Sequence, residues 1–130
     1  MRKMMKIEKQ NDNIKCIWKD RKRYFGLPIS FTQYGIFEKE GVWTKLFVQV
    51  GLLDTKIEEL HIYRIDDISV SQTLSNKIFG VGTIKIYCQD ASGDEVLIKN
   101  VKQPYKVRAM INDLVESART NKKIVFGEFQ

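Results

Sequence analysis

The sequence predicts a mainly β protein, in which about seven antiparallel strands are followed by one C-terminal α-helix. Two observations predict it. From Ile14 onward, short runs rich in Ile, Val, Phe, Tyr and Thr alternate with turn residues, a pattern typical of a β-barrel or sandwich. After Pro104 the apolar residues recur at spacings of three and four, the period of an amphipathic helix. The chain has 130 residues, so one domain with an ordinary core is expected.

Residues 1–13 are polar with scattered apolar side chains, and we interpret them as a basic N-terminal arm. The domain is expected to span residues 14–123. Gly, Asn, Asp, Ser and Pro separate its expected strands. The expected strands are residues 15–18, 29–38, 42–50, 56–65, 68–73, 82–89 and 95–101.

The helix is predicted from about residue 104 to 121, because a proline suits the first turn of a helix. Its apolar stripe consists of Val107, Met110, Ile111, Leu114, Val115 and Ala118. The opposite face, expected to be solvated, carries Arg108, Asn112, Glu116 and Arg119. Residues 124–130 form a tail too apolar to remain free in water, which makes it a candidate for self-association. Its candidate contact residues are Ile124, Val125, Phe126 and Phe129.

The net charge of +6 is concentrated at the N-terminus, because residues 1–23 hold nine basic and three acidic residues while the rest of the chain is neutral. Four cations stand close together beside three aromatic residues, in a segment expected to be a loop. They are Lys19, Arg21, Lys22 and Arg23. Such a cluster suits an anionic lipid headgroup, and less specifically a nucleic-acid backbone. The alternative interpretation is a hydrated loop that only keeps the protein soluble.

No catalytic or metal-binding constellation accompanies these charges. His61 is the one histidine, and no serine or cysteine is placed to be its nucleophile. Cys16 and Cys88 lack CxxC spacing and are interpreted as thiols packed as small hydrophobes. We therefore expect no enzyme, no cofactor, no metal and no small-molecule substrate. The chain has no apolar run of membrane-spanning length and no signal-peptide core, so cytoplasmic residence is expected.

Four motifs in the middle of the chain carry a family resemblance. They read Tyr-Gly-Ile at 34–36, Val-Gly-Leu-Leu at 50–53, Leu-His-Ile-Tyr-Arg-Ile-Asp-Asp-Ile at 60–68 and Phe-Gly-Val-Gly-Thr-Ile at 79–84. With the flanking elements, roughly residues 14–121 resemble the bacterial pleckstrin-homology (PH) domains of the YdbS-like family. The resemblance implies a PH-like barrel of two roughly orthogonal sheets, closed by the C-terminal helix. The motif residues expected to be structural are Gly51, Arg64, Ile65, Asp67, Gly80 and Gly82.

The resemblance implies a non-enzymatic binding or assembly module, and we expect it to self-associate through barrel edges or the tail. A homo-oligomer or an unidentified protein partner is therefore expected, and nucleic acid is not. The alternative is peripheral binding to an anionic membrane, at its inner face, through the basic N-terminal region. Phosphoinositide-binding PH domains carry basic residues around their first hairpin. The place taken to match, residues 38–45, has two acidic residues and no Arg, so lipid contact is expected to be nonspecific and salt-sensitive.

Overall fold

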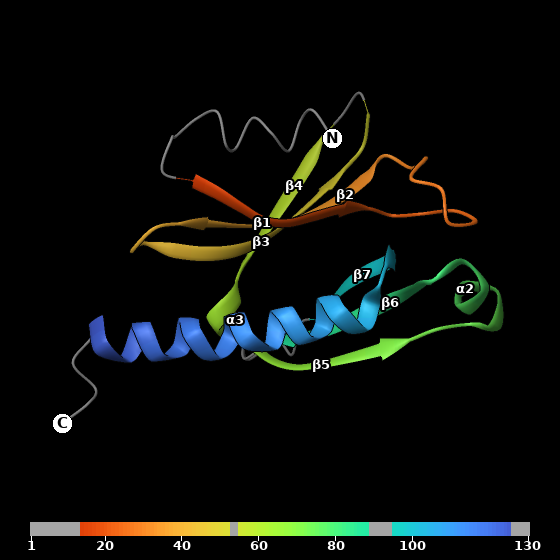
Figure 1. The fold of residues 1–130 in the computed structure, drawn as a ribbon. Coiled ribbons are helices and arrows are strands. Elements are labelled where there is room, and N and C mark those ends of the chain that lie inside the picture. The colour runs from red at the N-terminus through yellow and green to blue at the C-terminus, as the bar shows by residue number, and fades with distance from the viewer. Residues whose placement is uncertain (1–13, 53–54, 89–94, 126–130) are drawn as a thin grey trace.

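The structure is a computed structural model that describes residues 14–52, 55–88 and 95–125, with side chains described as far as residue 120. It holds two antiparallel sheets, one of four strands and one of three, each with its strands in sequence order. The first sheet comprises β1 (Ile14–Arg21), β2 (Thr32–Lys39), β3 (Trp43–Val50) and β4 (Lys56–His61), and the second β5 (Ile65–Ser71), β6 (Val81–Cys88) and β7 (Glu95–Lys102). The 3-10 turn η1 (Ile62–Arg64) links the sheets, the short helix α2 (Leu74–Phe79) links β5 to β6, and α3 (Pro104–Val125) follows β7 (Figure 1).

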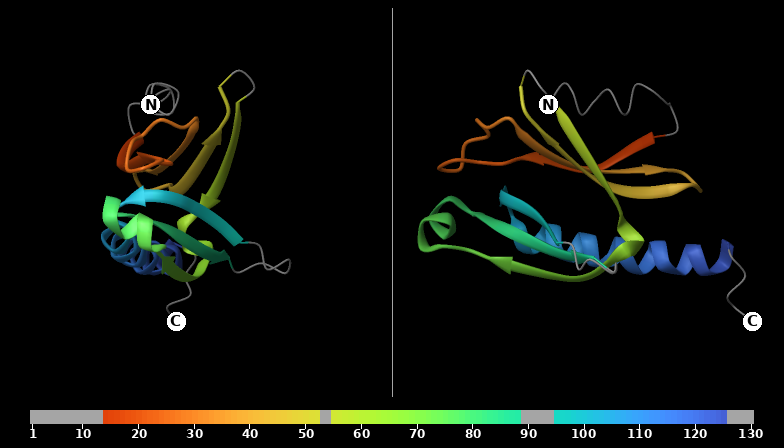
Figure 2. Two further views of the ribbon diagram at one scale, coloured as in Figure 1. Left: turned by 90° about the vertical axis from the view of Figure 1, so that its right-hand side faces the viewer. Right: turned by 180° about the vertical axis from the view of Figure 1, so that it is seen from behind.

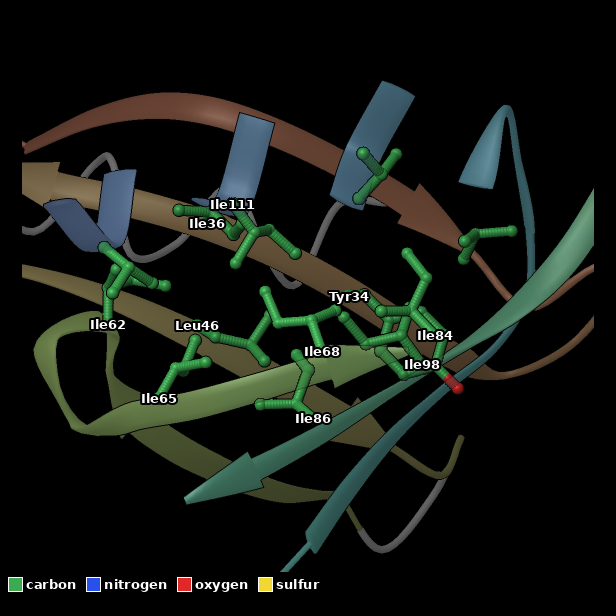
Figure 3. Close-up of a cluster of buried hydrophobic side chains, with 13 residues drawn as sticks. Tyr34, Ile36, Leu46, Ile62, Ile65, Ile68, Ile84, Ile86, Ile98 and Ile111 are labelled. Atoms are coloured by element: carbon green, nitrogen blue, oxygen red, sulfur yellow. The ribbon is translucent and has the colours of Figure 1, made fainter. Parts of the chain in front are cut away.

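The core lies between the two sheets, with α3 packed against η1, β5 and β6 (Figure 2). Figure 3 shows side chains from both sheets and from α3 converging in this space. Buried members include Ile36 and Leu46 from the first sheet, Ile84 and Ile98 from the second, and Ile111 from α3. The mainly β class and the PH-like arrangement predicted from the sequence are thus confirmed. The sheets are not closed into one barrel, because β1 and β7 approach each other without pairing.

The first two strands differ from their predicted bounds. The first strand does not end at Trp18 but continues through Arg21, where Asp20 pairs with Tyr34. The second strand begins only at Thr32. Three charged residues in a row, 19–21, favour a loop in the sequence, but a strand tolerates them when the partner strand supplies the hydrogen bonds and only one face meets the core.

The predicted strand over residues 56–65 is broken by η1. Ile62 is fully buried in this turn, and β5 then starts at Ile65, so the chain crosses from one sheet to the other here. The helix α2 was not predicted, because six residues are too few to display a helical period. Thr73 accepts a hydrogen bond from the Asn76 N–H at its start, and Gly80 ends it.

The motif residues occupy turns and crossings. Gly80 adopts φ 68 at the end of α2, a conformation that favours glycine. A Cβ on Gly82 would lie 2.8 Å from atoms of Gln72 and Pro104, so the space requires glycine. Gly51 follows β3 and has φ 106. Arg64 ends η1 and is exposed, whereas Ile65 directly after it lies in the core. Asp67 accepts a hydrogen bond of 2.8 Å from the Ile68 N–H.

The predicted helix is present and its apolar stripe faces the core, with Val107, Ile111 and Val115 buried. It runs on to Val125, past the predicted end at residue 121, so Ile124 belongs to the helix rather than to a tail. One residue of the face expected to be solvated is instead half-buried. The Arg119 guanidinium donates to the carbonyls of Tyr63 (3.2 Å) and Ile65 (2.5 Å), because the helix passes over the crossing between the sheets.

Candidate functional site

A cleft of about 290 Å³ opens between the end of β1 and the start of α3. Its walls come from four parts of the fold: β1, the loop after it, the end of β7 and the first turns of α3. The lining residues are Trp18, Lys19, Asp20, Arg23, Lys102, Gln103, Lys106, Val107 and Met110. Four cations and one carboxylate therefore share a small open volume with an indole ring and a thioether.

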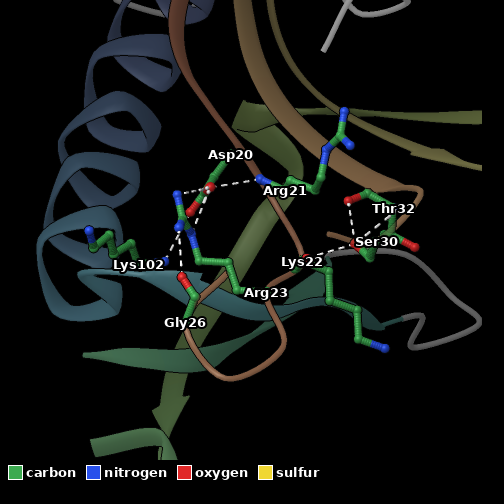
Figure 4. A network of polar contacts seen from close by, with 8 residues as sticks. All are labelled: Asp20, Arg21, Lys22, Arg23, Gly26, Ser30, Thr32 and Lys102. Atoms are coloured by element: carbon green, nitrogen blue, oxygen red, sulfur yellow. Dashed lines mark hydrogen bonds and ion pairs between the residues drawn. The ribbon is translucent and has the colours of Figure 1, made fainter. Parts of the chain in front are cut away.

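Asp20 organises this cleft and is itself only 9% exposed. One of its carboxylate oxygens accepts hydrogen bonds from the Arg21 N–H (2.7 Å) and the Arg23 Nε (3.2 Å), and the other accepts from the Lys102 N–H (2.9 Å) (Figure 4). Arg23 also donates to the Gly26 carbonyl at 2.9 Å. These bonds tie β1, the loop after it and the end of β7 together. They also satisfy the only carboxylate in the lining.

The four predicted anion-binding cations do not form one patch. Lys19 and Arg23 line the cleft, whereas Arg21 and Lys22 point away from Asp20 (Figure 4). The Lys22 ammonium lies 5.1 Å from the centre of the Tyr24 ring, within reach of a cation–π contact. Because Arg23 is held by Asp20 and Gly26, it is a fixed charge rather than a free loop side chain.

Sequence reasoning missed the two cations that complete the cleft, Lys102 and Lys106. They lie about 80 positions after Lys19 in the chain, and only the approach of β7 to β1 brings them together. A signal was nevertheless present. Acidic residues are missing from residues 21–37, 68–89 and 96–112, which together hold nine Lys and Arg residues.

These three acid-free segments meet at one end of the molecule. The Arg23 N–H donates to the Asn100 carbonyl at 2.9 Å, which joins the first segment to the third. The Gln103 N–H donates to the Gly80 carbonyl at 3.1 Å, which joins the third segment to the second. The cleft thus belongs to a larger region with many cations and one satisfied carboxylate, an arrangement that attracts anions.

The other candidate residues lie elsewhere. His61 ends β4, and its ring packs 5.2 Å from that of Tyr63 on the sheet, outside the cleft. Cys16 and Cys88 are half-buried thiols in different sheets. The side chains of Ile124 and Val125 are not described, and the remaining tail candidates, Phe126 and Phe129, lie outside the described residues.

Within residues 14–52, 55–88 and 95–125, no group of three His, Cys, Asp or Glu side chains is arranged to hold a metal ion. The helices in this part of the chain are too short or too polar to cross a membrane.

The first hairpin also differs from the predicted one. In the structure it joins β1 to β2 across residues 22–31, whereas residues 38–45 surround the second hairpin. The two acidic residues counted there therefore say nothing about the first hairpin loop, which contains Lys22 and Arg23 and no acidic residue.

A family model described as a bacterial PH domain matches residues 25–115 of the chain. No match was found among curated proteins or among solved structures. The matched segment includes the motifs at 34–36, 50–53, 60–68 and 79–84 and most of α3.

Proposed function

The chain belongs to the bacterial PH domain family, and from this premise we propose that it is a non-enzymatic module that attaches peripherally to anionic membrane surfaces through the basic cleft. PH-like domains are generally binding modules rather than enzymes. The observation that carries the proposal is the cleft itself, where Lys19, Arg23, Lys102 and Lys106 surround one carboxylate whose hydrogen bonds are satisfied. In a cytoplasmic setting the surface bound is the inner face of the membrane.

The energetics favour a surface carrying many charges over a single small anion. A Lys or Arg beside an acidic bilayer contributes about 1 kcal/mol, and this is reduced by salt. The four cleft cations, Lys19, Arg23, Lys102 and Lys106, supply several such contributions at one place.

Self-association, the first expectation from the sequence, is the second candidate function here, favoured by the apolar residues 124–129. The described edge strands offer it little support. The exposed edge of β4 carries Lys56, Glu58 and Glu59, and β5 begins with Asp66 and Asp67 after Ile65. Charges on an edge strand disfavour pairing with another edge.

The proposal is tested by sedimenting the protein with vesicles of phosphatidylglycerol and phosphatidylcholine in equal parts, at low and at high salt. We expect binding at low salt that is weakened at high salt, and little binding to vesicles of phosphatidylcholine alone. Reversing two cleft charges with Lys102→Glu and Lys106→Glu should weaken binding by at least about thirtyfold, from about 1 kcal/mol per lost cation.

The matched control is Lys15→Glu with Lys39→Glu, which makes the same change in net charge at the opposite end of β1 and β2. It should weaken vesicle binding much less. Equal weakening by both pairs, or no binding to acidic vesicles at low salt, would contradict the proposal. Tighter binding to duplex DNA than to vesicles would favour a nucleic-acid partner instead.

A further inference from the structure

The end of the molecule that carries the basic cleft also exposes large apolar side chains. We call the loop of residues 24–31 together with α2 the apolar tip. In the loop, Phe25 is 78% exposed and Ile29 62%. In α2, Leu74 is 79% exposed and Ile78 74%. A soluble domain rarely exposes so many large apolar side chains in one place unless the surface binds something.

The two parts of the apolar tip lie side by side. Figures 1 and 2 place the loop after β1 next to α2 in every view. The Phe25 and Phe79 rings meet edge to face with centroids 6.1 Å apart, and a Cβ on Gly26 would lie 3.3 Å from the Phe79 side chain. The two connections are therefore in contact through Phe25, Gly26 and Phe79.

The loop is held in this exposed conformation by its own hydrogen bonds. Tyr24 and Leu27 exchange two backbone hydrogen bonds of 3.0 and 2.9 Å, and the Ser30 hydroxyl donates to the Lys22 carbonyl at 2.6 Å. Phe25 at the turn has φ 53, which is unfavourable for a bulky residue. The two-residue turn between Tyr24 and Leu27 requires a positive φ at both of its central residues, so the backbone conformation follows from the turn itself. Such a turn favours Asn or Gly rather than a large aromatic residue, and a phenylalanine left 78% exposed at this position points to binding.

The short helix α2 likewise is ordered but exposes apolar side chains. α2 has a side-chain cap at Thr73 and a glycine cap at Gly80, yet none of its residues is buried. Leu74 and Ile78 are four residues apart and so lie on one face of the helix. The helix is held to the domain by Asn76, which donates to the Asn100 side chain, and by Phe79, which packs on Phe25. Leu74 and Ile78 stay exposed beside this packing, which leaves an apolar face available to another surface.

The charges around the apolar tip identify that partner. Arg23 and Lys22 precede the loop, and Lys77 lies within α2. The cleft cations Lys102 and Lys106 stand close by, because Gln103 between them binds the Gly80 carbonyl. Apolar side chains surrounded by cations, with no acidic residue in the segments that carry them, match a bilayer with anionic headgroups above its hydrocarbon.

We infer that the apolar tip inserts into the boundary between headgroups and hydrocarbon of an anionic bilayer, while the cleft cations contact the headgroups. The inference rests on the proposed function for the orientation of the molecule. Insertion of the apolar side chains adds a contribution to the binding free energy that salt does not screen, because screening acts on charges and not on the burial of apolar area.

Insertion is detected by placing a fluorophore at the tip. In Phe25→Trp, we expect the emission to shift to shorter wavelength when vesicles of phosphatidylglycerol and phosphatidylcholine are added, and to be quenched by lipids brominated on their acyl chains. The control is Val42→Trp, because Val42 is 65% exposed in the hairpin at the opposite end of β2. It should show neither change, once the signal of the native Trp18 and Trp43 has been subtracted using the unchanged chain.

The apolar contribution is measured by a matched pair of exposed substitutions. Ile78→Ser should weaken vesicle binding by about tenfold and reduce the part that persists at high salt, since one of the aliphatic side chains no longer enters the bilayer. Val42→Ser should leave binding unchanged. Both side chains are exposed, so both variants should fold, which circular dichroism checks.

The outcomes separate the two proposals. No binding of the unchanged chain to acidic vesicles at low salt overturns the proposed function. Binding at low salt that high salt releases completely, with no emission shift in Phe25→Trp, overturns the inference alone. A dimer in solution that Ile78→Ser dissociates, without vesicle binding, would mean that a second copy covers the tip, and this also overturns the inference.

Discussion

Asp20 joins parts of the chain that are far apart in sequence, since its two carboxylate oxygens reach Arg21, Arg23 and Lys102. In the sequence it is one acidic residue inside a basic segment, and nothing in its neighbours distinguishes it from a surface charge. Burial to 9% exposure is tolerated because three donors replace the water that the carboxylate loses. A buried carboxylate with satisfied hydrogen bonds depends on which backbone N–H groups point at it, and the amino-acid composition does not reveal this.

The buried phenol of Tyr34 should make the stability of the fold depend on pH in the alkaline range. Its ring is buried, its hydroxyl accepts a hydrogen bond of 3.0 Å from the Lys99 N–H, and burial raises the pKa of the phenol above its ordinary value of 10.0, partly opposed by that hydrogen bond. The unfolded chain therefore releases this proton near pH 10 while the folded chain retains it. Since the folded state then binds more protons, stability falls as the pH rises above about 10.

Tyr34→Phe should lower the free energy of unfolding at neutral pH by about 1–2 kcal/mol, because the Lys99 N–H loses its acceptor. The loss of stability above pH 10 should become shallower in the variant, because one group no longer contributes to it. Urea unfolding at neutral and at alkaline pH measures both effects. An identical pH dependence in the two proteins would mean that Tyr34 does not contribute to the alkaline loss.

Whether a helix or strand could be predicted from the sequence depended on its length and on how often its apolar pattern repeats. The stripe of α3 repeats over four turns and was predicted residue by residue, and the alternating strands β5 and β6 were placed to within three residues. η1 and α2 are too short to repeat a pattern, so they were missed. The extent of β1 was missed for a different reason, because its last residues are charged and only the pairing with β2 makes them a strand.

Arg119 is the element-scale test of how α3 is held. Arg119→Met keeps much of the aliphatic stem but removes the donors to the carbonyls of Tyr63 and Ile65. We expect it to lower the free energy of unfolding by about 1.5–3 kcal/mol, the usual range for a hydrogen bond made by a charged group. The control is Arg108→Met on the exposed face of the same helix, which should change stability by less than about 0.5 kcal/mol. Equal shifts of the urea midpoint in the two variants would contradict the idea that the Arg119 hydrogen bonds hold α3 to the segment between the sheets.

Seen as a whole, the molecule has two different ends. One carries the basic cleft, the acid-free segments and the apolar tip, and the other carries the second hairpin with Glu38 and Glu40. This polarity arises because antiparallel strands bring the connections β1–β2, β5–β6 and β7–α3 to the same end. A surface with one attractive end favours a fixed orientation at a charged interface.

Self-association is also a property of the whole molecule. If residues 124–130 join copies of the chain, light scattering should give the full-length protein a mass above that of one chain. Deleting residues 124–130 should then lower it, because the apolar contact area is lost. The control is a deletion of residues 8–13, which removes six residues that are all polar or charged. An unchanged mass on deleting the tail would exclude it as the contact.

The sequence by itself determined the mainly β class, the long C-terminal helix with its buried stripe and the membership implied by four motifs, because hydrophobic period and turn chemistry act over neighbouring residues. It also located the basic segment around Lys19–Arg23. Only the tertiary structure decided which cations act together, since Lys19 and Arg23 meet Lys102 and Lys106 through the approach of β1 to β7. It likewise decided that the loop after β1 and α2 form one apolar tip. Contacts between segments about 50 to 80 residues apart follow from chain topology, and no local pattern in the sequence encodes them.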